Sequence, residues 1–265
     1  MPELPEVESE RRFLRDEIAG RRLVEVAVAR DPIVFEGVSP QKVRKALLGR
    51  RVVDLHRRGK HLWWELDRRP WPCFHLGMTG AWHGYTDVAE RPRFWKIELR
   101  AEGGRRVCMT NVRRLGRVRL REDPASQDPI ARLGPDPLID LPGPSAFSAA
   151  VRARRCPVKA LLLDQSFAAG VGNWIADEVL FQARIDPRRR ACDLDDAEAR
   201  RIRSALVRIV KKAVEVNAEA DRFPRTWLFH VRWGKDPGAV TSRGQRLRYD
   251  TIGGRTAAWC PDVQH

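Results

Sequence analysis

The feature that most constrains the fold is a change of hydrophobic period at a Pro- and Asp-dense stretch, residues 123–147. Before this stretch, short apolar runs such as LVEVAVA (23–29) alternate with polar residues, and turn signals such as Arg58-Gly59 separate them. After it, apolar residues recur at helical spacing. Many short, closely spaced strands indicate a sandwich or barrel of about 120 residues. The pattern therefore predicts an α+β chain of two domains.

Individual elements of the first half can be assigned from local signals. A helix is expected from Pro5-Glu6 to Gly20, because proline and acidic residues suit a first turn and glycine suits a stop. Strands are expected at seven apolar runs: 23–29, 51–55, 61–66, 72–78, 94–100, 105–109 and 117–120.

The second half is expected to contain three helices and a final β-hairpin. The first helix should span residues 157–167 and the second residues 174–184, and the third should begin at an Asp195…Glu198 capping box. The third carries a continuous apolar stripe: Ile202, Leu206, Ile209, Ala213 and Val216. These signals predict four segments: a β-sandwich domain at 1–122, a linker at 123–147, a helical domain at 148–232 and a hairpin at 233–265.

Charge and composition point to a polyanionic partner. Lys and Arg together number 50 and Asp and Glu together 35, so the net charge is +15. Most of the cations are arginine, and the base composition of the genome can account for part of that preference. A hydrophobic fraction of 43% excludes disorder as the main description. No apolar run approaches the ~18 residues of a membrane span, and the N-terminus lacks a secretory signal. Five separated cysteines without a CxxC motif indicate free thiols in a reducing cytoplasm.

The extreme N-terminus carries the residue with the most distinctive chemistry. Met1 precedes the small residue Pro2, a context in which the initiator methionine is usually removed, and removal exposes a secondary amine. Such an amine attacks an aldehyde-like carbon and forms an iminium ion, which is an electron sink for elimination. An α-amine has a pKa of ~7.7–8.0, so part of it is neutral near pH 7. Taken alone, the residues favour a simple lead-in to a helix over a catalytic amine.

Six segments in a fixed order extend this observation to the whole chain. They are MPELPEVE, RRGKHLWWEL around Lys60, HLGMTG (75–80), NVRRLGR (111–117), LLLDQSFAAGVGNWIADEVL (161–180) and the C-terminal GGRTAAWCPDVQH. In order and spacing the chain resembles the formamidopyrimidine-DNA glycosylase / endonuclease VIII family of base-excision repair enzymes. Leu4 and Val7 are more similar to the formamidopyrimidine branch.

The resemblance implies roles for the N-terminal residues and for two strand residues. Pro2 would be the nucleophile at the sugar C1′, Glu3 the acid that protonates the ribose ring oxygen, and Glu6 a supporting carboxylate. Lys60 would hold a phosphate next to the lesion, and His75 would approach the same phosphate. Taken alone, Lys60 reads as a solvated turn charge and His75 as a structural histidine.

Three further positions match the family's residues that fill the space left by an everted base. An enzyme that takes a base out of the stack needs slender apolar or planar wedges with a cation nearby. Met78, Arg113 and Leu115 match these positions, and Arg114 matches a phosphate contact. Leu115 departs from the branch, which usually has Phe there, and this leaves lesion choice open. On composition alone, Met78 would be a core residue.

The helical half carries the remaining implied contacts with DNA. Gly170 and Gly172 allow a tight turn that approaches a phosphate, and N–H groups at the start of the next helix form an anion site. By resemblance this is a helix–two-turn–helix with Asn173 as a phosphate ligand; an N-cap Asn is the alternative. Glu178 would anchor the motif internally, and Arg255 at the hairpin tip would bind another phosphate.

The C-terminal hairpin lacks the metal ligands that the resemblance would supply. Family members commonly end in a four-cysteine zinc finger, but only Cys260 remains of the four positions. One thiolate cannot hold tetrahedral zinc, and Asp262 and His265 do not complete the set. We therefore expect a zincless finger with no metal. Four apolar or aromatic residues should hold its shape: Leu247, Tyr249, Ile252 and Trp259.

Together the residues and the resemblance predict a bifunctional DNA glycosylase/AP lyase that removes oxidised bases and nicks by β- and δ-elimination. It should need no cofactor and should act as a monomer on damaged double-stranded DNA. We expect no membrane association and a location in the cytoplasm, at the bacterial nucleoid. The segment 218–233 lacks the glycine-rich character of the branch's lesion-capping loop, so the preferred lesion stays open. Two alternatives are an inactive family member that only binds damaged or abasic DNA, and a general basic nucleic-acid-binding protein.

Overall fold

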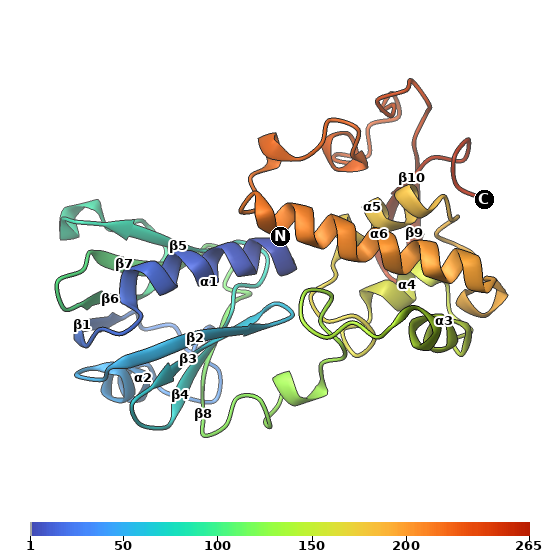
Figure 1. The fold of residues 1–265 in the computed structure, drawn as a ribbon. Helices are drawn as coiled ribbons and strands as arrows, with labels where there is room; N and C mark the ends of the chain where they lie inside the picture. The colour runs from blue at the N-terminus through green and yellow to red at the C-terminus, as the bar shows by residue number, and fades with distance from the viewer. Residues whose placement is uncertain (1) are drawn as a thin grey trace. The chain divides into compact units, whose positions relative to one another are not determined.

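The computed structural model describes residues 2–265, and these divide into two compact units. The first unit comprises Pro2 and Glu6–Arg132, and the second comprises Glu3–Pro5 and Leu133–His265. Helix α1 (Leu4–Ile18) therefore begins in the second unit and continues in the first (Figure 1). In the described part of the chain, every helix is too short or too polar to cross a bilayer.

The first unit contains two four-stranded antiparallel sheets (Figure 1). One has the order β1 (Leu23–Val28), β6 (Trp95–Ala101), β7 (Arg106–Asn111) and β5 (Gly80–Tyr85). The other has the order β2 (Val52–Arg58), β3 (His61–Leu66), β4 (Trp71–His75) and β8 (Arg117–Arg121). Helix α2 (Pro40–Leu47) and the short 3-10 helices η1 (Val88–Glu90) and η2 (Ile130–Arg132) complete the unit.

Apolar side chains from both sheets and from α1 form one core. The rings of Trp64 and Phe74 in one sheet lie 5.3 Å from the ring of Trp82 in the other, centroid to centroid. Leu14 and Ile18 of α1 are fully buried in the same cluster. The predicted β-sandwich with an N-terminal helix is confirmed.

The sequence pattern does not predict two elements of this unit. Strand β5 has the sequence GAWHGY, whose two glycines interrupt any alternation of apolar and polar residues. Only its pairing with β7 identifies it as a strand. Helix α2 is only eight residues long. Its start is nevertheless regular, because the side chain of Ser39 accepts a hydrogen bond from the backbone N–H of Lys42.

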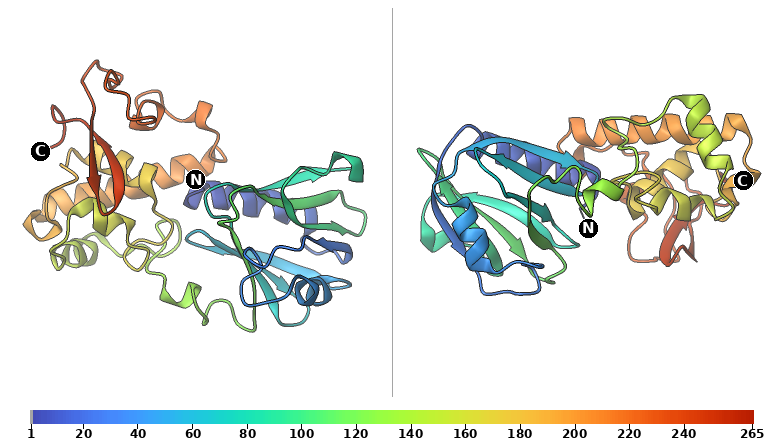
Figure 2. Two further views of the ribbon diagram at one scale, coloured as in Figure 1. Left: turned by 180° about the vertical axis from the view of Figure 1, so that it is seen from behind. Right: turned by 90° about the horizontal axis from the view of Figure 1, so that it is seen from below.

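The second unit is helical and ends in a hairpin. Its helices are α3 (Pro144–Arg152), α4 (Val158–Leu163), α5 (Asn173–Ala183) and α6 (Asp196–Glu215), and its strands are β9 (Arg248–Ile252) and β10 (Arg255–Trp259). Three 3-10 helices lie between them: η3 (Ala191–Asp193), η4 (Ala220–Arg222) and η5 (Leu228–His230). In the view from behind, the hairpin lies beside α5 (Figure 2).

Helix α6 follows the sequence closely. The Asp195 side chain accepts the Glu198 N–H at 2.7 Å while the Glu198 carboxylate accepts the Asp195 N–H at 2.9 Å, so the capping box is confirmed. Helix α4 is shorter than predicted and ends at Leu163, because Asp164 turns the chain by accepting the Ser166 N–H. Helix α3 begins at Pro144, within the stretch assigned to the linker.

Candidate active site and nucleic-acid interface

The carboxylate of Glu3 occupies the N-terminus of α5. Its oxygens accept hydrogen bonds from the backbone N–H groups of Trp174 at 2.9 Å and Ile175 at 3.2 Å, and the residue is only 2% exposed. Unpaired N–H groups at a helix start favour a negative charge. The predicted anion site thus holds the chain's own carboxylate in this structure, and a phosphate contact at the start of α5 stays a prediction.

The glycines of the preceding turn make room for this contact. A Cβ on Gly172 would lie 2.3 Å from the carboxyl carbon of Glu3, a distance that no real Cβ contact tolerates. Gly170 has φ +92°, and its carbonyl accepts the N–H of Leu4 at 3.1 Å. The AAGVGN turn is thus shaped to receive the first residues of the chain.

Pro2 and Glu6 flank this anchored segment. Pro2 precedes Glu3 directly and is half-buried, and Glu6 is half-buried in the first turn of α1. Met1 lies outside the described residues, so its removal stays a prediction. Anchoring of Glu3 limits where a Pro2 amine can lie, since the two residues share one peptide bond.

Lys60 lies in the turn between β2 and β3. The turn needs glycine at position 59, where φ is +56°. The guanidinium of Arg57 donates to the Gly59 carbonyl at 2.9 Å and also pairs with Glu8 at 3.1 Å. Both of these side chains are buried, so a buried ion pair fixes the backbone that carries Lys60.

Two neighbouring histidines lie beside Lys60. The rings of His61 and His75 are 4.8 Å apart. Burial and then the charge of Lys60 lower the pKa of His75 to about 4, and burial and then His75 lower the pKa of His61 to about 3. Neutral His75 accepts the Gly77 N–H at Nδ1 at 3.2 Å. His75 therefore lies opposite the residue that follows Lys60, and the phosphate role of Lys60 and His75 stays a prediction.

The three candidate void-filling residues lie on two adjoining loops of the first unit. One Nη atom of Arg113 lies 3.4 Å from the Met78 sulfur, and the Arg113 N–H donates to the Thr79 hydroxyl at 3.3 Å. Leu115 is 41% exposed. The alternative that Met78 is a core residue is wrong, because it is only half-buried at the loop surface.

Asn111 joins these two loops, and sequence reasoning gave it no role. Its side chain is fully buried, donates to the Leu76 carbonyl at 2.8 Å and accepts the Gly116 N–H at 3.0 Å. The backbones meet closely as well, since a Cβ on Gly77 would lie 2.5 Å from the carbonyl carbon of Leu115. One neutral amide therefore sets the spacing of the loops that carry Met78 and Leu115.

Arg114 pairs with a carboxylate in this structure. Its Nε and one Nη atom lie 2.9–3.2 Å from the oxygens of Asp31, which also pairs with Lys96 at 2.8 Å. Burial tends to raise the pKa of Asp31, but hydrogen bonds from these two cations outweigh it and lower the pKa. Arg114 would have to exchange this partner to bind a phosphate.

Asn173 and Arg255 frame the hairpin tip of the second unit. The Asn173 amide donates to the Thr256 carbonyl at 2.9 Å, and Arg255 follows the Gly253-Gly254 turn as the first residue of β10. Within residues 2–265, the exposed Arg255 side chain has neither an ion pair nor a hydrogen bond. The alternative that Asn173 is an N-cap is wrong, because Gly172 is the N-cap and Asn173 the first helical residue.

Comparison with known proteins settles the family. The sequence model of the formamidopyrimidine-DNA glycosylase N-terminal domain matches residues 1–118, and that of the formamidopyrimidine-DNA glycosylase H2TH domain matches residues 133–224. The chain belongs to the formamidopyrimidine-DNA glycosylase family. Formamidopyrimidine-DNA glycosylases of Arabidopsis thaliana and Paracoccus denitrificans are each 37% identical to it over its full length, which covers 71% and 100% of those proteins.

Solved structures of this family share the fold. A Lactococcus lactis formamidopyrimidine-DNA glycosylase bound to DNA with an abasic site matches with a TM-score of 0.87, 25% identity and 99% coverage of both chains. A variant of the same protein bound to DNA containing Fapy-dG matches with a TM-score of 0.87, 26% identity and full coverage of both chains. These matches confirm the two-domain fold with its C-terminal hairpin.

The C-terminal finger does not fit the zinc ion common in formamidopyrimidine-DNA glycosylases. Across residues 2–265, no three His, Cys, Asp or Glu side chains are grouped to hold a metal. Side chains close the two turns instead: Thr241 accepts the Gln245 N–H at 3.3 Å, and Gln264 accepts the Cys260 N–H at 2.8 Å. Cys260 is buried with Leu247, and Tyr249 packs against the same cluster. The expectation of no zinc stays a prediction.

The segment that precedes the finger is ordered. The Glu178 carboxylate accepts the Phe229 N–H at 3.0 Å, and burial raises the pKa of Glu178 to about 7. Aromatic rings of Trp174, Phe223 and Trp227 pack together beside it. Glu178 therefore anchors the segment after α6, a contact that the prediction of an anchor inside the motif did not include.

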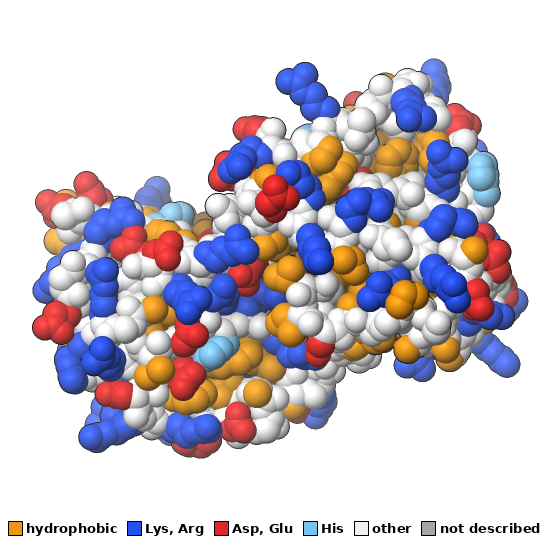
Figure 3. All heavy atoms as spheres, viewed as in Figure 1, with side chains coloured by type: hydrophobic (Ala, Val, Ile, Leu, Met, Phe, Trp, Pro, Cys, Tyr) orange, Lys and Arg blue, Asp and Glu red, His pale blue; other side chains and the backbone are white. Residues whose placement is uncertain are grey.

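Most cations lie elsewhere on the surface. On the face of the molecule in Figure 3, Lys and Arg side chains are scattered rather than gathered in one patch. Many of them pair with carboxylates, as Arg189 does with Glu198 at 2.6 Å. On this face the net charge of +15 therefore marks no single DNA-binding patch, and sequence-specific or lesion-specific contacts must come from positioned groups.

Proposed function

We propose that this protein is a bifunctional DNA glycosylase/AP lyase of base-excision repair that acts on oxidised bases and abasic sites in duplex DNA. The observation that carries the proposal is the fixed position of Glu3 at the start of α5, directly after Pro2, in a chain that belongs to this family over its full length. A carboxylate held next to a secondary amine suits proton transfer between the two groups.

The chemistry starts with the amine of Pro2 once Met1 is removed. Glu3 accepts the proton of the Pro2 ammonium, the free amine attacks C1′, and Glu3 returns the proton to the ribose ring oxygen as the C1′–O4′ bond breaks. At a base lesion the C1′–base bond breaks, and the leaving base takes up the proton that the attacking N–H loses as the iminium ion forms. At an abasic site the amine condenses with the C1′ aldehyde and water is lost.

The resulting iminium ion drives strand cleavage. It withdraws electrons from C2′, so a C2′ proton is lost to a base and the bond to the 3′ phosphate oxygen breaks, which is β-elimination. A second proton loss with departure of the 5′ phosphate gives δ-elimination. No redox cofactor or metal ion is needed for either step, because the iminium ion supplies the electron sink.

The remaining candidate residues would bind the DNA. Lys60 and His75 would hold one phosphate near the lesion, and Asn173 and Arg255 others, since cations and side-chain amides are common phosphate ligands. Arg114 would bind a further phosphate after leaving Asp31. Met78, Arg113 and Leu115 would fill the gap left by the everted nucleotide.

The relatives support a single partner, damaged duplex DNA. The solved Lactococcus lactis proteins are described as bound to DNA with an abasic site or with Fapy-dG. We propose that the present protein acts as a monomer on such DNA, in the cytoplasm at the bacterial nucleoid.

Borohydride trapping on duplex DNA with one abasic site tests the proposal. The reagent reduces the iminium ion to a stable amine, so the Met-processed protein should form a covalent adduct. Pro2→Gly should be trapped far less, and protein with an uncleaved N-terminal tag not at all. DNA binding without trapping by the processed protein would favour the inactive family member, and equal binding of undamaged DNA would favour a general nucleic-acid-binding protein.

A further inference from the structure

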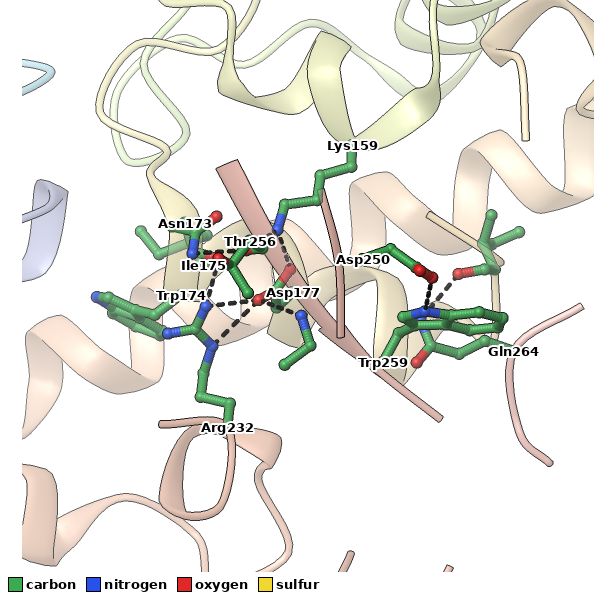
Figure 4. Close-up of polar contacts among 12 residues, drawn as sticks. Lys159, Asn173, Trp174, Ile175, Asp177, Arg232, Asp250, Thr256, Trp259 and Gln264 are labelled. Carbon is green, nitrogen blue, oxygen red and sulfur yellow. Dashed lines mark hydrogen bonds and ion pairs between the residues drawn. The ribbon is translucent and has the colours of Figure 1, made fainter. Parts of the chain in front are cut away.

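A buried cluster of charges joins α4, α5 and the hairpin in the second unit, and the proposed chemistry does not use it (Figure 4). Asp177 of α5 pairs with Lys159 of α4 at 2.6 Å and with Arg232 at 2.5 Å. The three side chains are 1%, 0% and 4% exposed. Burying three charges carries a desolvation cost, so the cluster is weak evidence for a purely stabilising role.

The cluster binds the outer edge of β10. The Asp177 carboxylate accepts the Ala258 N–H at 3.1 Å, and the Lys159 ammonium donates to the Thr256 carbonyl at 2.7 Å (Figure 4). Asn173 donates to the same carbonyl at 2.9 Å. The hairpin has only two strands, so β10 lacks a partner strand on this side. Side chains of α4 and α5 replace that strand and fix β10 in register.

Two proposed phosphate ligands depend on this edge. Arg255 directly precedes Thr256, and Asn173 shares the Thr256 carbonyl with Lys159. Arg232 also donates to the backbone carbonyl of Asn173 at 3.4 Å. The hairpin tip rests on α4 as well, since a Cβ on Gly253 would lie 3.0 Å from the Cβ of Ala160.

We propose that Asp177 is a positioning residue for DNA binding, which holds the Arg255 end of β10 and Asn173 in one fixed arrangement through Lys159, Arg232 and the Ala258 N–H. Asp177 itself touches no DNA, because it is buried beneath the strand. The proposal rests on the proposed function, in which Arg255 and Asn173 bind phosphates. Its partner chemistry is therefore the phosphate backbone of the damaged strand.

The salt dependence of DNA binding separates positioning from a merely structural role. For duplex DNA, the slope of log K against log salt concentration falls by about 0.9 for each phosphate that the protein no longer neutralises. Asp177→Asn should weaken binding of abasic-site duplex about tenfold and flatten the slope by up to about 0.9. Partial unfolding would reduce the active fraction without changing the slope. The loss of one negative charge, taken alone, would make the slope steeper.

Asp196→Asn is the matched control. It makes the same charge change in the same unit and removes ion pairing to Arg152, but its exposed side chain binds Ser148 and Arg152 of α3 and does not touch β10. It should leave the slope unchanged. Arg255→Ala sets the reference by removing the proposed contact itself.

Combination with Arg255→Ala decides the outcome. If Asp177 acts through Arg255, the double variant has the slope of Arg255→Ala alone; a further decrease of about 0.9 would overturn the proposal. An unchanged slope in Asp177→Asn, or in Arg255→Ala itself, would also overturn it.

A second set of variants tests the proposal if Asp177→Asn does not fold. The triple variant Lys159→Met/Asp177→Leu/Arg232→Met replaces all three charges with apolar side chains, a change that buried ion clusters often tolerate. Adding Arg255→Ala to this variant should again leave the slope unchanged. Borohydride trapping of the wild-type protein, run in parallel, tests the proposed function separately: trapping with a failed slope test rejects only the role of Asp177.

Discussion

The loops that carry Met78 and Leu115 in the first unit and the strand that carries Arg255 in the second are held by different chemistry. A single neutral amide, Asn111, joins the two loops through one donated and one accepted hydrogen bond. The strand is held by Asp177 together with two buried cations. Both arrangements act on backbone groups, and only the second also uses a proposed DNA ligand, since the Asn173 amide donates to the Thr256 carbonyl.

The Asn111 amide and the Asp177 ion cluster tolerate different substitutions. A neutral amide carries no large desolvation cost, so its loss leaves two backbone groups without partners and nothing more. A buried carboxylate must stay matched to its cations, since removal of one partner leaves an uncompensated charge. Burial lowers the pKa of Lys159 from its usual range, while the charge of Asp177 opposes that shift. The second device is thus sensitive to charge, and the first is sensitive only to shape.

The largest expected effect comes from the close approach of Gly172 to the Glu3 side chain in the second unit. Gly172→Ala places a Cβ 2.3 Å from the carboxyl carbon of Glu3 and must displace that carboxylate. A displacement near 1 Å should lower borohydride trapping and lyase turnover about 100-fold. Gly143→Ala is the control, because Gly143 is the N-cap of α3 and a Cβ there meets nothing within 4 Å. Equal activity of the two variants would rule out a role for the Glu3 position.

Removal of the neutral amide should come next in size. Asn111→Val leaves the Leu76 carbonyl and the Gly116 N–H unpaired, which should lower the free energy of unfolding by about 2 kcal/mol. Binding of abasic duplex should weaken, while trapping on single-stranded abasic DNA should persist, because no gap needs filling there. Thr110→Val, at the neighbouring strand position whose hydroxyl bonds His83 and the Ala81 carbonyl instead of the loops, is the control for chemical denaturation. A uniform loss on both substrates would contradict a loop-specific role.

Acid should loosen the loops of the first unit in a defined pH window. Burial lowers the pKa of His75 to about 4 and of His61 to about 3, so the folded state binds fewer protons than the unfolded chain, whose histidines titrate near 6.5. Stability should be complete above about pH 6.5 and fall by about 3 kcal/mol for each histidine as the pH drops to about 4. His61→Gln/His75→Gln should flatten this decline, and the exposed His230→Gln should not. An unchanged pH profile in the double variant would contradict the prediction.

The smallest effect is expected at an exposed wedge. Leu115 is 41% exposed, so Leu115→Ala should leave the melting temperature unchanged but weaken binding of abasic duplex about fivefold. Leu115→Phe should restore or exceed wild-type binding, because an aromatic ring stacks on bases. Val112→Ala, at a 53% exposed position in the same loop, provides the comparison. Equal affinities for all four proteins would show that the wedge does not contact DNA.

Elements with a complete local signal could be predicted from the sequence. The strand HLWWEL at residues 61–66 is predicted to the residue, and the capping box and apolar stripe of α6 are predicted because each is written within one segment. Strand β5 and helix α2 were missed, since the first depends on pairing with β7 and the second is short.

The contacts of the candidate site depend on residues far apart in the chain. Glu3 and Trp174 are 171 positions apart, so no spacing rule indicates that a carboxylate fills the α5 N-terminus. Asn111 stands inside the NVRRLGR motif, yet its function follows only from the meeting of two loops. The sequence predicts Arg114 as a cation for DNA, and its pairing with Asp31 could not be read from residues 83 positions apart.

The division of α1 between the units limits how this protein can be taken apart. Leu4 is fully buried in the core of the second unit, although Glu6 onward belongs to the first. A fragment beginning at Leu133 would lack this side chain and would leave the Trp174 and Ile175 N–H groups without the Glu3 carboxylate. Cutting the chain at its apparent boundary therefore cannot yield an intact second half. Fragment complementation would have to supply a peptide of the first five residues, and such a peptide should stabilise the fragment on addition.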